Sequence, residues 1–178
     1  MSSITRFIEE NLKLKVNKDK SKVDRPWNLK YLGFTFYRKK SEMGIRVHPN
    51  SVNKLKSKLK EITGRSNAMS MKLGVIKLRQ VIVGWVNYFK LSDMKSTLKT
   101  LDKWLRRRIC LCYWKQWKRI KTKHDNLKKL GIDEYKAWEY ANTRKGYWRI
   151  SNSPILAKTL TNKYLKEQGF VTLTEKYL

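Results

Sequence analysis

The residues with the clearest chemical potential lie between Trp104 and Lys123, WLRRRICLCYWKQWKRIKTK. These twenty positions hold eight Lys and Arg, four aromatic residues and no acid. The spacing predicts an amphipathic helix, because apolar residues recur along one stripe. Phosphates attract positive charge and bases stack on indoles, so the opposite face is a candidate nucleic-acid surface; a solvated helix face is the simpler alternative. The residues of that face are Lys103, Arg107, Trp114, Lys118 and Lys121.

The composition extends the same bias to the whole chain. Its 178 residues include 42 Lys and Arg against 14 Asp and Glu, a net charge of +28. Such an excess repels itself unless a polyanion neutralises it. Because 40% of the residues are hydrophobic and 12% are aromatic, the chain is predicted to fold around a core rather than to form a disordered basic arm.

The cysteine, histidine and terminal residues indicate no metal or membrane site. Cys110 and Cys112 stand two apart on a predicted helix, so they point to different faces and a disulfide between them is not expected. Together with His124 they do not fit a zinc spacing, and we expect buried or half-buried thiols, with no metal and no cofactor bound by this chain. Glu9 and Glu10 interrupt the start of the chain where a signal peptide needs an apolar run. A cytoplasmic protein without a membrane partner is therefore expected.

The hydrophobic pattern predicts a mainly α fold with a small β portion (α+β). A helix with a buried face is expected from Ser2 or Ser3 to Leu12, followed by a strand over 12–16 and a turn over 17–20. Strands over 30–37 and 44–48 are predicted to pair as a hairpin through a turn at 39–41. Helices are expected over 52–62 (capped by Asn50 or Ser51), 70–90, 96–121, 124–130, 133–141, 154–159 and 161–168, with a break at 64–67. Gly74 and Gly84 are expected to serve close helix packing.

Two further places are candidates for binding nucleic acid. The hexapeptide RKGYWR places Arg144, Lys145 and Arg149 around Tyr147 and Trp148, with a turn expected at Gly146. Tyr147 and Trp148 are predicted to stack on unpaired bases, at roughly 1–3 kcal/mol per base, although at least one of them is expected to anchor the segment to the core. Arg79 interrupts an apolar helix, which indicates either a phosphate contact or an ion pair at the buried edge.

Four segments resemble the C-terminal half of a bacterial group II intron-encoded reverse transcriptase/maturase. LKLKVNKDKSKV (12–23) is similar to the late palm, and KYLGFTF (30–36) to the primer-grip strand, with Leu32, Gly33 and Phe34 as its centre. GWVNYF (84–89) is similar to a signature of the maturase-specific thumb region. The segment 144–165 is similar to the C-terminal DNA-binding segment of these proteins.

The resemblance implies a palm remnant with the primer-grip strand (1–48), thumb/maturase-specific helices (49–95) and a basic helical nucleic-acid-binding domain (96–178). It further implies binding of structured intron RNA to aid splicing, and gripping of a primer–template duplex. The implied partners are group II intron RNA, a DNA target or primer–template, and a separate N-terminal polymerase half. Lys20 stands at the position of a late-palm lysine.

The chain departs from that family at the polymerase site, which needs the carboxylates of a Tyr-x-Asp-Asp turn to hold two metal ions. The adjacent acid pairs here are Glu9-Glu10 and Asp133-Glu134, and neither has the surroundings of a palm hairpin. We therefore predict no catalytic residues, an idle Lys20, Mg²⁺ only in a complete polymerase, and no polymerase activity from this chain alone. The alternatives are one part of a split, active RNA-directed DNA polymerase, a general basic RNA-binding protein, or a helix-turn-helix DNA-binding protein.

Overall fold

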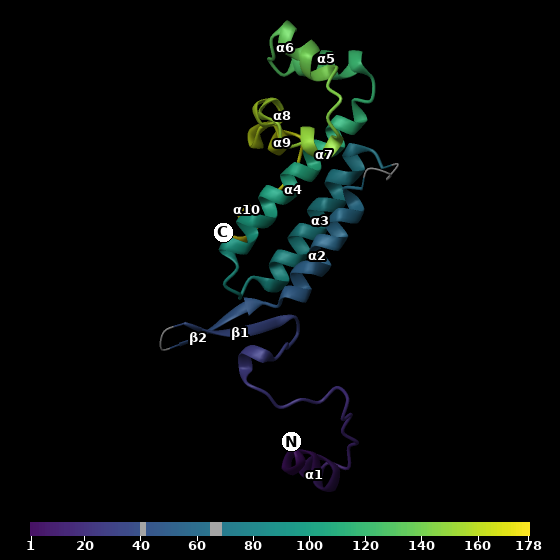
Figure 1. The fold of residues 1–178 in the computed structure, drawn as a ribbon. Coiled ribbons are helices and arrows are strands. Elements are labelled where there is room, and N and C mark those ends of the chain that lie inside the picture. The colour runs from purple at the N-terminus through teal and green to yellow at the C-terminus, as the bar shows by residue number, and fades with distance from the viewer. Residues whose placement is uncertain (40–41, 65–68) are drawn as a thin grey trace.

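The computed structural model describes residues 1–39, 42–64 and 69–178, and Figure 1 shows their arrangement. Helices dominate, and a single two-stranded sheet is present in these ranges. The predicted mainly α fold with a small β portion is therefore confirmed. The predicted turn at 39–41 and the predicted break at 64–67 lie largely outside the described residues.

The N-terminal segment differs most from the prediction. Helix α1 (Ser2–Asn11) forms where expected, but it buries none of its residues, and Phe7 is 58% exposed. No strand forms over 12–16, because a strand needs a neighbour to accept its backbone hydrogen bonds and the described residues supply none there. The predicted turn is confirmed, since the Asn17 side chain accepts hydrogen bonds from the amides of Asp19 and Lys20.

A short 3-10 helix, η1 (Pro26–Asn28), leads into the predicted hairpin. Strand β1 (Phe34–Lys39) pairs antiparallel with β2 (Glu42–Val47), and Phe34 lies opposite Val47. The first strand begins four residues later than predicted. Leu32 and Gly33 have positive φ angles, 50° and 88°, and so form a turn that cannot continue a strand.

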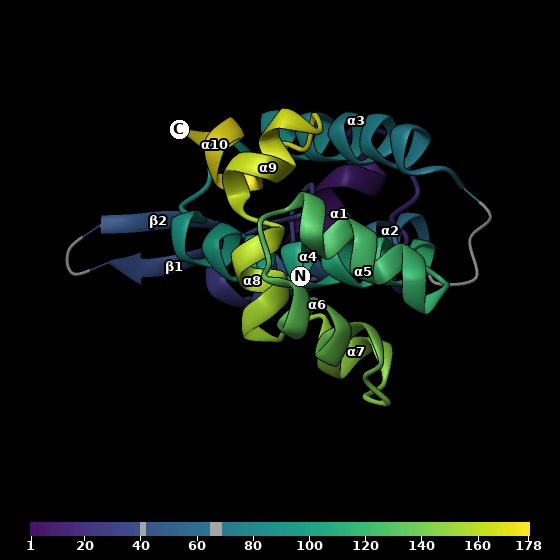
Figure 2. The same ribbon diagram turned by 90° about the horizontal axis from the view of Figure 1, so that it is seen from above.

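Three long helices carry the core. Figures 1 and 2 show α2 (Pro49–Ile62), α3 (Met71–Phe89) and α4 (Lys95–Gln116) running together, with the hairpin at one end. The predicted apolar stripes are buried, and their central residues include Leu55, Leu59, Leu78, Ile82, Leu98, Leu101 and Leu105. Helix α2 is capped by His48, whose Nδ1 accepts from the Asn50 amide, and not by Asn50 or Ser51. The buried residues form one cluster from Val47 to Leu173, and the predicted boundary at 95/96 stays a prediction.

The predicted helix over 96–121 is two helices. Helix α4 ends at Gln116, and after a buried Trp117 the chain turns into α5 (Ile120–Lys129). Helices α6 (Glu134–Ala141), α8 (Pro154–Thr159) and α9 (Asn162–Glu167) follow as predicted. The short helices α7 (Tyr147–Ile150) and α10 (Leu173–Tyr177) were not predicted. Helix α10 packs against α3 and α4, because the Asp102 carboxylate accepts hydrogen bonds from the amides of Leu173 and Thr174.

Close packing does not explain two of the helical glycines. Among the described residues, a Cβ at Gly74 or at Gly84 would meet no atom within 4 Å beyond the neighbouring backbone of its own helix, so the prediction for both is wrong. Among the described helices none is long and apolar enough to cross a membrane.

Candidate nucleic-acid interface

The two motifs LGF and GWVNYF meet where the hairpin joins the helices. The Tyr88 hydroxyl donates a hydrogen bond of 3.0 Å to the Leu32 carbonyl. The Phe34 ring lies 4.9 Å from that of Phe89, edge to face, and 5.8 Å from that of Tyr88, stacked. Each aromatic pair adds about 0.5–1.5 kcal/mol beyond the area that it buries. The hairpin is therefore held on α3 by a specific aromatic cluster.

Gly33 sits inside this junction. A Cβ at Gly33 would lie 2.9 Å from Ser51 Oγ and 3.0 Å from the Phe89 ring, and Ser51 Oγ donates a hydrogen bond to the Gly33 carbonyl. Side chains of α2 and α3 thus fill the space beside Gly33, and the positive φ angles of Leu32 and Gly33 make this segment a turn. Leu32 is 64% exposed while Phe34 is half-buried, and their primer-grip role, with that of Gly33, stays a prediction.

The arginines that follow Leu105 fasten separate helices to α4. Arg106 Nη2 donates to the carbonyls of Leu160 (2.9 Å) and Ala157 (3.3 Å), at the end of α8. Arg108 donates from Nε to Thr63 Oγ1 (2.6 Å) and from Nη2 to the Thr63 carbonyl (2.8 Å), just after α2. Carbonyls at a helix end lack partners within the helix, so each guanidinium satisfies groups that burial would otherwise leave unpaired.

Arg107 has a structural partner as well. Its Nη2 donates to the Trp148 carbonyl over 2.8 Å, and its guanidinium lies 3.9 Å from the centre of the Trp148 indole. This cation–π contact fixes the indole from one side. Trp148 nevertheless keeps 42% of its surface exposed. Arg107 thus positions an exposed aromatic surface, and its predicted contact with nucleic acid stays a prediction.

In the segment around Trp148, one aromatic residue is anchored to the core and the other residues of the motif are exposed, as predicted. Arg144, Lys145 and Arg149 are exposed, whereas the half-buried Tyr147 packs against the core and is the anchor. Gly146 precedes α7 with φ of −58°, and a Cβ there would meet no atom of the described residues within 4 Å. Any residue can adopt that backbone, so the expected glycine-dependent turn is absent.

The prediction that Trp114 is an exposed stacking residue is wrong. Its side chain is 1% exposed, with Lys123 Nζ 5.0 Å from the ring centre on one side and Trp117 packed nearby. Helix α4 ends at Gln116, so the chain that follows it can turn back and bring Trp117 and Lys123 against the Trp114 ring. Lys118 and Lys121 remain exposed, but Lys118 lies between the helices and Lys121 on α5.

Two further predicted phosphate contacts are accessible. Lys103 is exposed on α4 and Arg79 is exposed on α3. Arg79 forms no ion pair with any described residue, so the alternative of an ion pair at the buried edge is wrong. Lys20 lies in the exposed turn after Asn17, and its predicted idle role stays a prediction.

Few cations of the described chain are neutralised by carboxylates. Lysine–carboxylate pairs there join Lys22 to Asp24, Lys58 to Glu61, Lys128 to Glu134 and Lys166 to Glu175. Other acids serve backbone amides, as Asp102 does at α10 and Asp133 at the start of α6. With 42 basic and 14 acidic residues, this use of the acids leaves a strongly positive surface.

In the acid pair Asp133-Glu134, Asp133 caps α6 and Glu134 joins α6 to α5. Asp133 accepts from the Lys136 amide, while Glu134 Oε1 accepts from the Trp138 indole N–H and lies 2.9 Å from His124 Nε2. The neighbouring Lys128 lowers the pKa of the Glu134 carboxyl through a hydrogen bond. Sequence spacing did not reveal this cluster, because His124 and Glu134 lie on different helices. Within the described ranges no three His, Cys, Asp or Glu side chains gather as a metal site requires.

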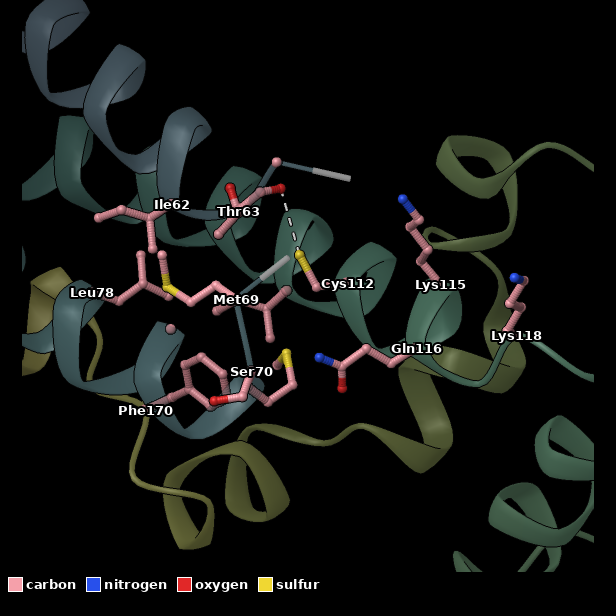
Figure 3. Close-up of a pocket in the computed structure, with 14 residues that line it drawn as sticks. Ile62, Thr63, Met69, Ser70, Leu78, Cys112, Lys115, Gln116, Lys118 and Phe170 are labelled. Atoms are coloured by element: carbon pink, nitrogen blue, oxygen red, sulfur yellow. Dashed lines mark hydrogen bonds between the residues drawn. The ribbon is translucent and has the colours of Figure 1, made fainter. Parts of the chain in front are cut away.

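A cavity of about 530 Å³ lies between the ends of α2 and α4 and the start of α3. Figure 3 shows the apolar side chains of Leu78 and Phe170 on one side and the lysines at 115 and 118 on the other. The Cys112 thiol donates to the Thr63 carbonyl, and burial raises its pKa. Burial also raises the pKa of Cys110 to about 11. Both cysteines are free thiols, buried or half-buried as predicted.

Residues 52–131 match the model of a known protein family. No curated protein matches the chain. The matched segment, residues 52–131, contains α3, α4, α5 and the GWVNYF motif. It corresponds to the family described as group II intron, maturase-specific domain, and this similarity connects the chain with group II intron splicing.

Proposed function

We propose that this chain binds structured group II intron RNA and stabilises the RNA fold that splices, and that it grips primer–template nucleic acid when a complete polymerase is present. The match over 52–131 supports the choice of partner, and the charge of +28 supports binding to phosphates. A protein that binds folded RNA more tightly than misfolded RNA shifts the population toward the active form. No chemical step by the protein is needed for this role.

The observation that carries the proposal is the exposed indole of Trp148, held from behind by Arg107. Residues 140–166 contain no Asp or Glu, so Arg144, Lys145 and Arg149 face no nearby acid along this segment. A base can stack on the outer face of the indole while these cations contact its phosphates. Stacking of this kind contributes roughly 1–3 kcal/mol per base.

The matched test compares two tryptophans with the same exposed fraction. Trp148 and Trp138 are both 42% exposed, but Trp138 stacks on His124 and its indole N–H is bonded to Glu134. We expect Trp148→Ala to weaken binding of an intron RNA with unpaired loops by about 5- to 150-fold, and Trp138→Ala to leave it nearly unchanged. Binding is measured by filter retention after circular dichroism has shown that both variants fold. Equal losses from both variants, or equal losses on looped and fully duplex RNA, would remove base stacking from the proposal.

Two assays separate the alternatives. A general basic RNA-binding protein would bind a structured RNA of equal length and unrelated sequence as tightly as the intron, whereas we expect the intron to win a direct competition. A polymerase would extend a primer on an RNA template, and we expect none from this chain alone. Of its acid pairs, Asp133-Glu134 is engaged in contacts with α5 and α6, and Glu9-Glu10 lies exposed on α1.

A further inference from the structure

A second basic site lies away from Trp148, where the hairpin meets the start of α4. A cleft of about 810 Å³ opens there, lined by both strands, the α3–α4 connection, the first turns of α4 and Tyr177 of α10. Figure 1 shows this region at the end of α4 opposite to α5 and α6.

The cleft is positively charged. Its cations are Lys39, Arg46, Lys95 and Lys99, and its carboxylate is Asp93. Asp93 accepts a hydrogen bond of 2.7 Å from the Tyr37 hydroxyl. In the described part of the chain, no ion pair joins any of the four cations to a carboxylate. With four cations and one carboxylate, the cleft has an excess of positive charge.

A row of cations on α4 leads from this cleft toward Trp148. Lys95, Lys99, Lys103 and Arg107 follow one another at intervals of four residues, so they lie along one side of the helix. At 1.5 Å per residue the row advances about 6 Å per step and about 18 Å in total. The one acid within this part of α4, Asp102, is engaged by the amides of Leu173 and Thr174. The row therefore joins the two basic regions without an unengaged acid between them.

We infer that the cleft is a second phosphate-binding site, connected by this row to the Trp148 surface, so that one nucleic-acid backbone is bound at both ends of the row. The inference rests on the proposed function and specifies where a further part of the RNA lies. RNA stems are A-form, with a rise of about 2.8 Å per base pair, so a span of about 18 Å corresponds to roughly six to seven base pairs. A shorter ligand reaches only one end, whereas a longer one gains from binding both ends at once.

The test measures RNA affinity against salt concentration for hairpin RNAs with stems of about four and about twelve base pairs. The cleft variant is Arg46→Gln/Lys95→Gln/Lys99→Gln, and Lys95→Gln/Lys99→Gln is a second variant that leaves the Arg46–Tyr37 contact in place. A control with equal charge loss is Lys13→Gln/Lys15→Gln/Lys18→Gln, in the exposed segment after α1. On the long stem we expect the salt slope to become shallower by about 2–3 for the triple cleft variant and about 2 for the double. On the short stem the affinity should change little.

The outcomes separate this inference from the proposed function. If the unaltered chain binds neither RNA in a salt-dependent way, the proposed function fails. If it binds, but both folded cleft variants behave like the control on the long stem, the cleft inference alone is wrong. Equal effects on short and long stems would exclude the connected track. If the cleft variants lose binding of an acidic polypeptide such as poly-glutamate but keep the RNA affinity of the original chain, the cleft binds a protein partner. That result would also overturn the inference.

Discussion

Replacing Gly33 by alanine tests how the hairpin is held on the helices. The residue has φ of +88°, and its new Cβ would lie 2.9 Å from Ser51 Oγ and 3.0 Å from the Phe89 ring. The left-handed backbone costs about 1–2 kcal/mol with a side chain, and crowding in a packed region costs about 1–3 kcal/mol. We expect Gly33→Ala to lower the free energy of unfolding, or of hairpin release, by roughly 2–5 kcal/mol.

The assay combines urea unfolding with hydrogen exchange. Unfolding followed by circular dichroism reports the loss if the hairpin and helices unfold together. The Asp93 amide donates a hydrogen bond of 2.7 Å to the Ile45 carbonyl, so faster hydrogen exchange at this amide reports the destabilisation if only the hairpin detaches. The control is Gly84→Ala, because Gly84 is exposed within α3 and no other described part of the chain lies within 4 Å of a Cβ there. Alanine is the better helix former by about 1 kcal/mol, so this variant should be more stable than the original chain.

Unchanged urea midpoint and unchanged exchange at Asp93 in Gly33→Ala would refute the packing of the hairpin on α2 and α3. A destabilised Gly84→Ala would show instead that α3 has a neighbour on its exposed side. Ser51→Ala removes the nearest atom in the junction, and we expect its effect to be non-additive with that of Gly33→Ala, since the two residues are in contact.

Two smaller perturbations concern single carboxylates. Asp102→Asn should lower the free energy of unfolding by about 1–3 kcal/mol, because it removes the charge that accepts hydrogen bonds from two amides and from the Thr174 hydroxyl at α10. The control is Asp19→Asn, at an exposed turn. Equal thermal midpoints for the two variants would show that Asp102 does not anchor α10. Hydrogen bonds from Lys22 and Asn28 lower the pKa of Asp24 to about 2. Because the pKa is lowered, the ionised carboxylate stabilises the folded segment fully at pH values above 3.8. This stabilisation is lost as the pH falls through about 2. Titration by nuclear magnetic resonance should show this value in the original chain and a higher one in Lys22→Ala.

Local patterns in the sequence determined the helices and the hairpin. Leu98, Leu101, Leu105 and Ile109 repeat at helical spacing, and all four are buried on α4. The aromatic-rich stretch 30–37 and the short run 44–48 form the predicted strand pair, although the first strand starts later because of the turn at Leu32 and Gly33. The pattern failed at 12–16, where alternation is present but no neighbouring strand is described.

The candidate binding residues depended on contacts between segments far apart in the chain. The sequence assigned positive charge to both Arg107 and Lys103, but only the structure shows that Arg107 is engaged by Trp148, 41 residues later, while Lys103 stays exposed. The sequence likewise placed Trp114 among cations, but the structure buries it, with Trp117 and Lys123 packed near its ring.

Sequence alone therefore determined the charge, the periodic elements and the signature GWVNYF, because each is a property of neighbouring residues. The tertiary structure decided which aromatic side chains are exposed and which arginines serve as helix anchors. It also decided that Gly33 makes room for Ser51 and Phe89. Exposure and hydrogen bonding depend on which helix covers a given face, and helix packing brings together residues that local spacing does not relate.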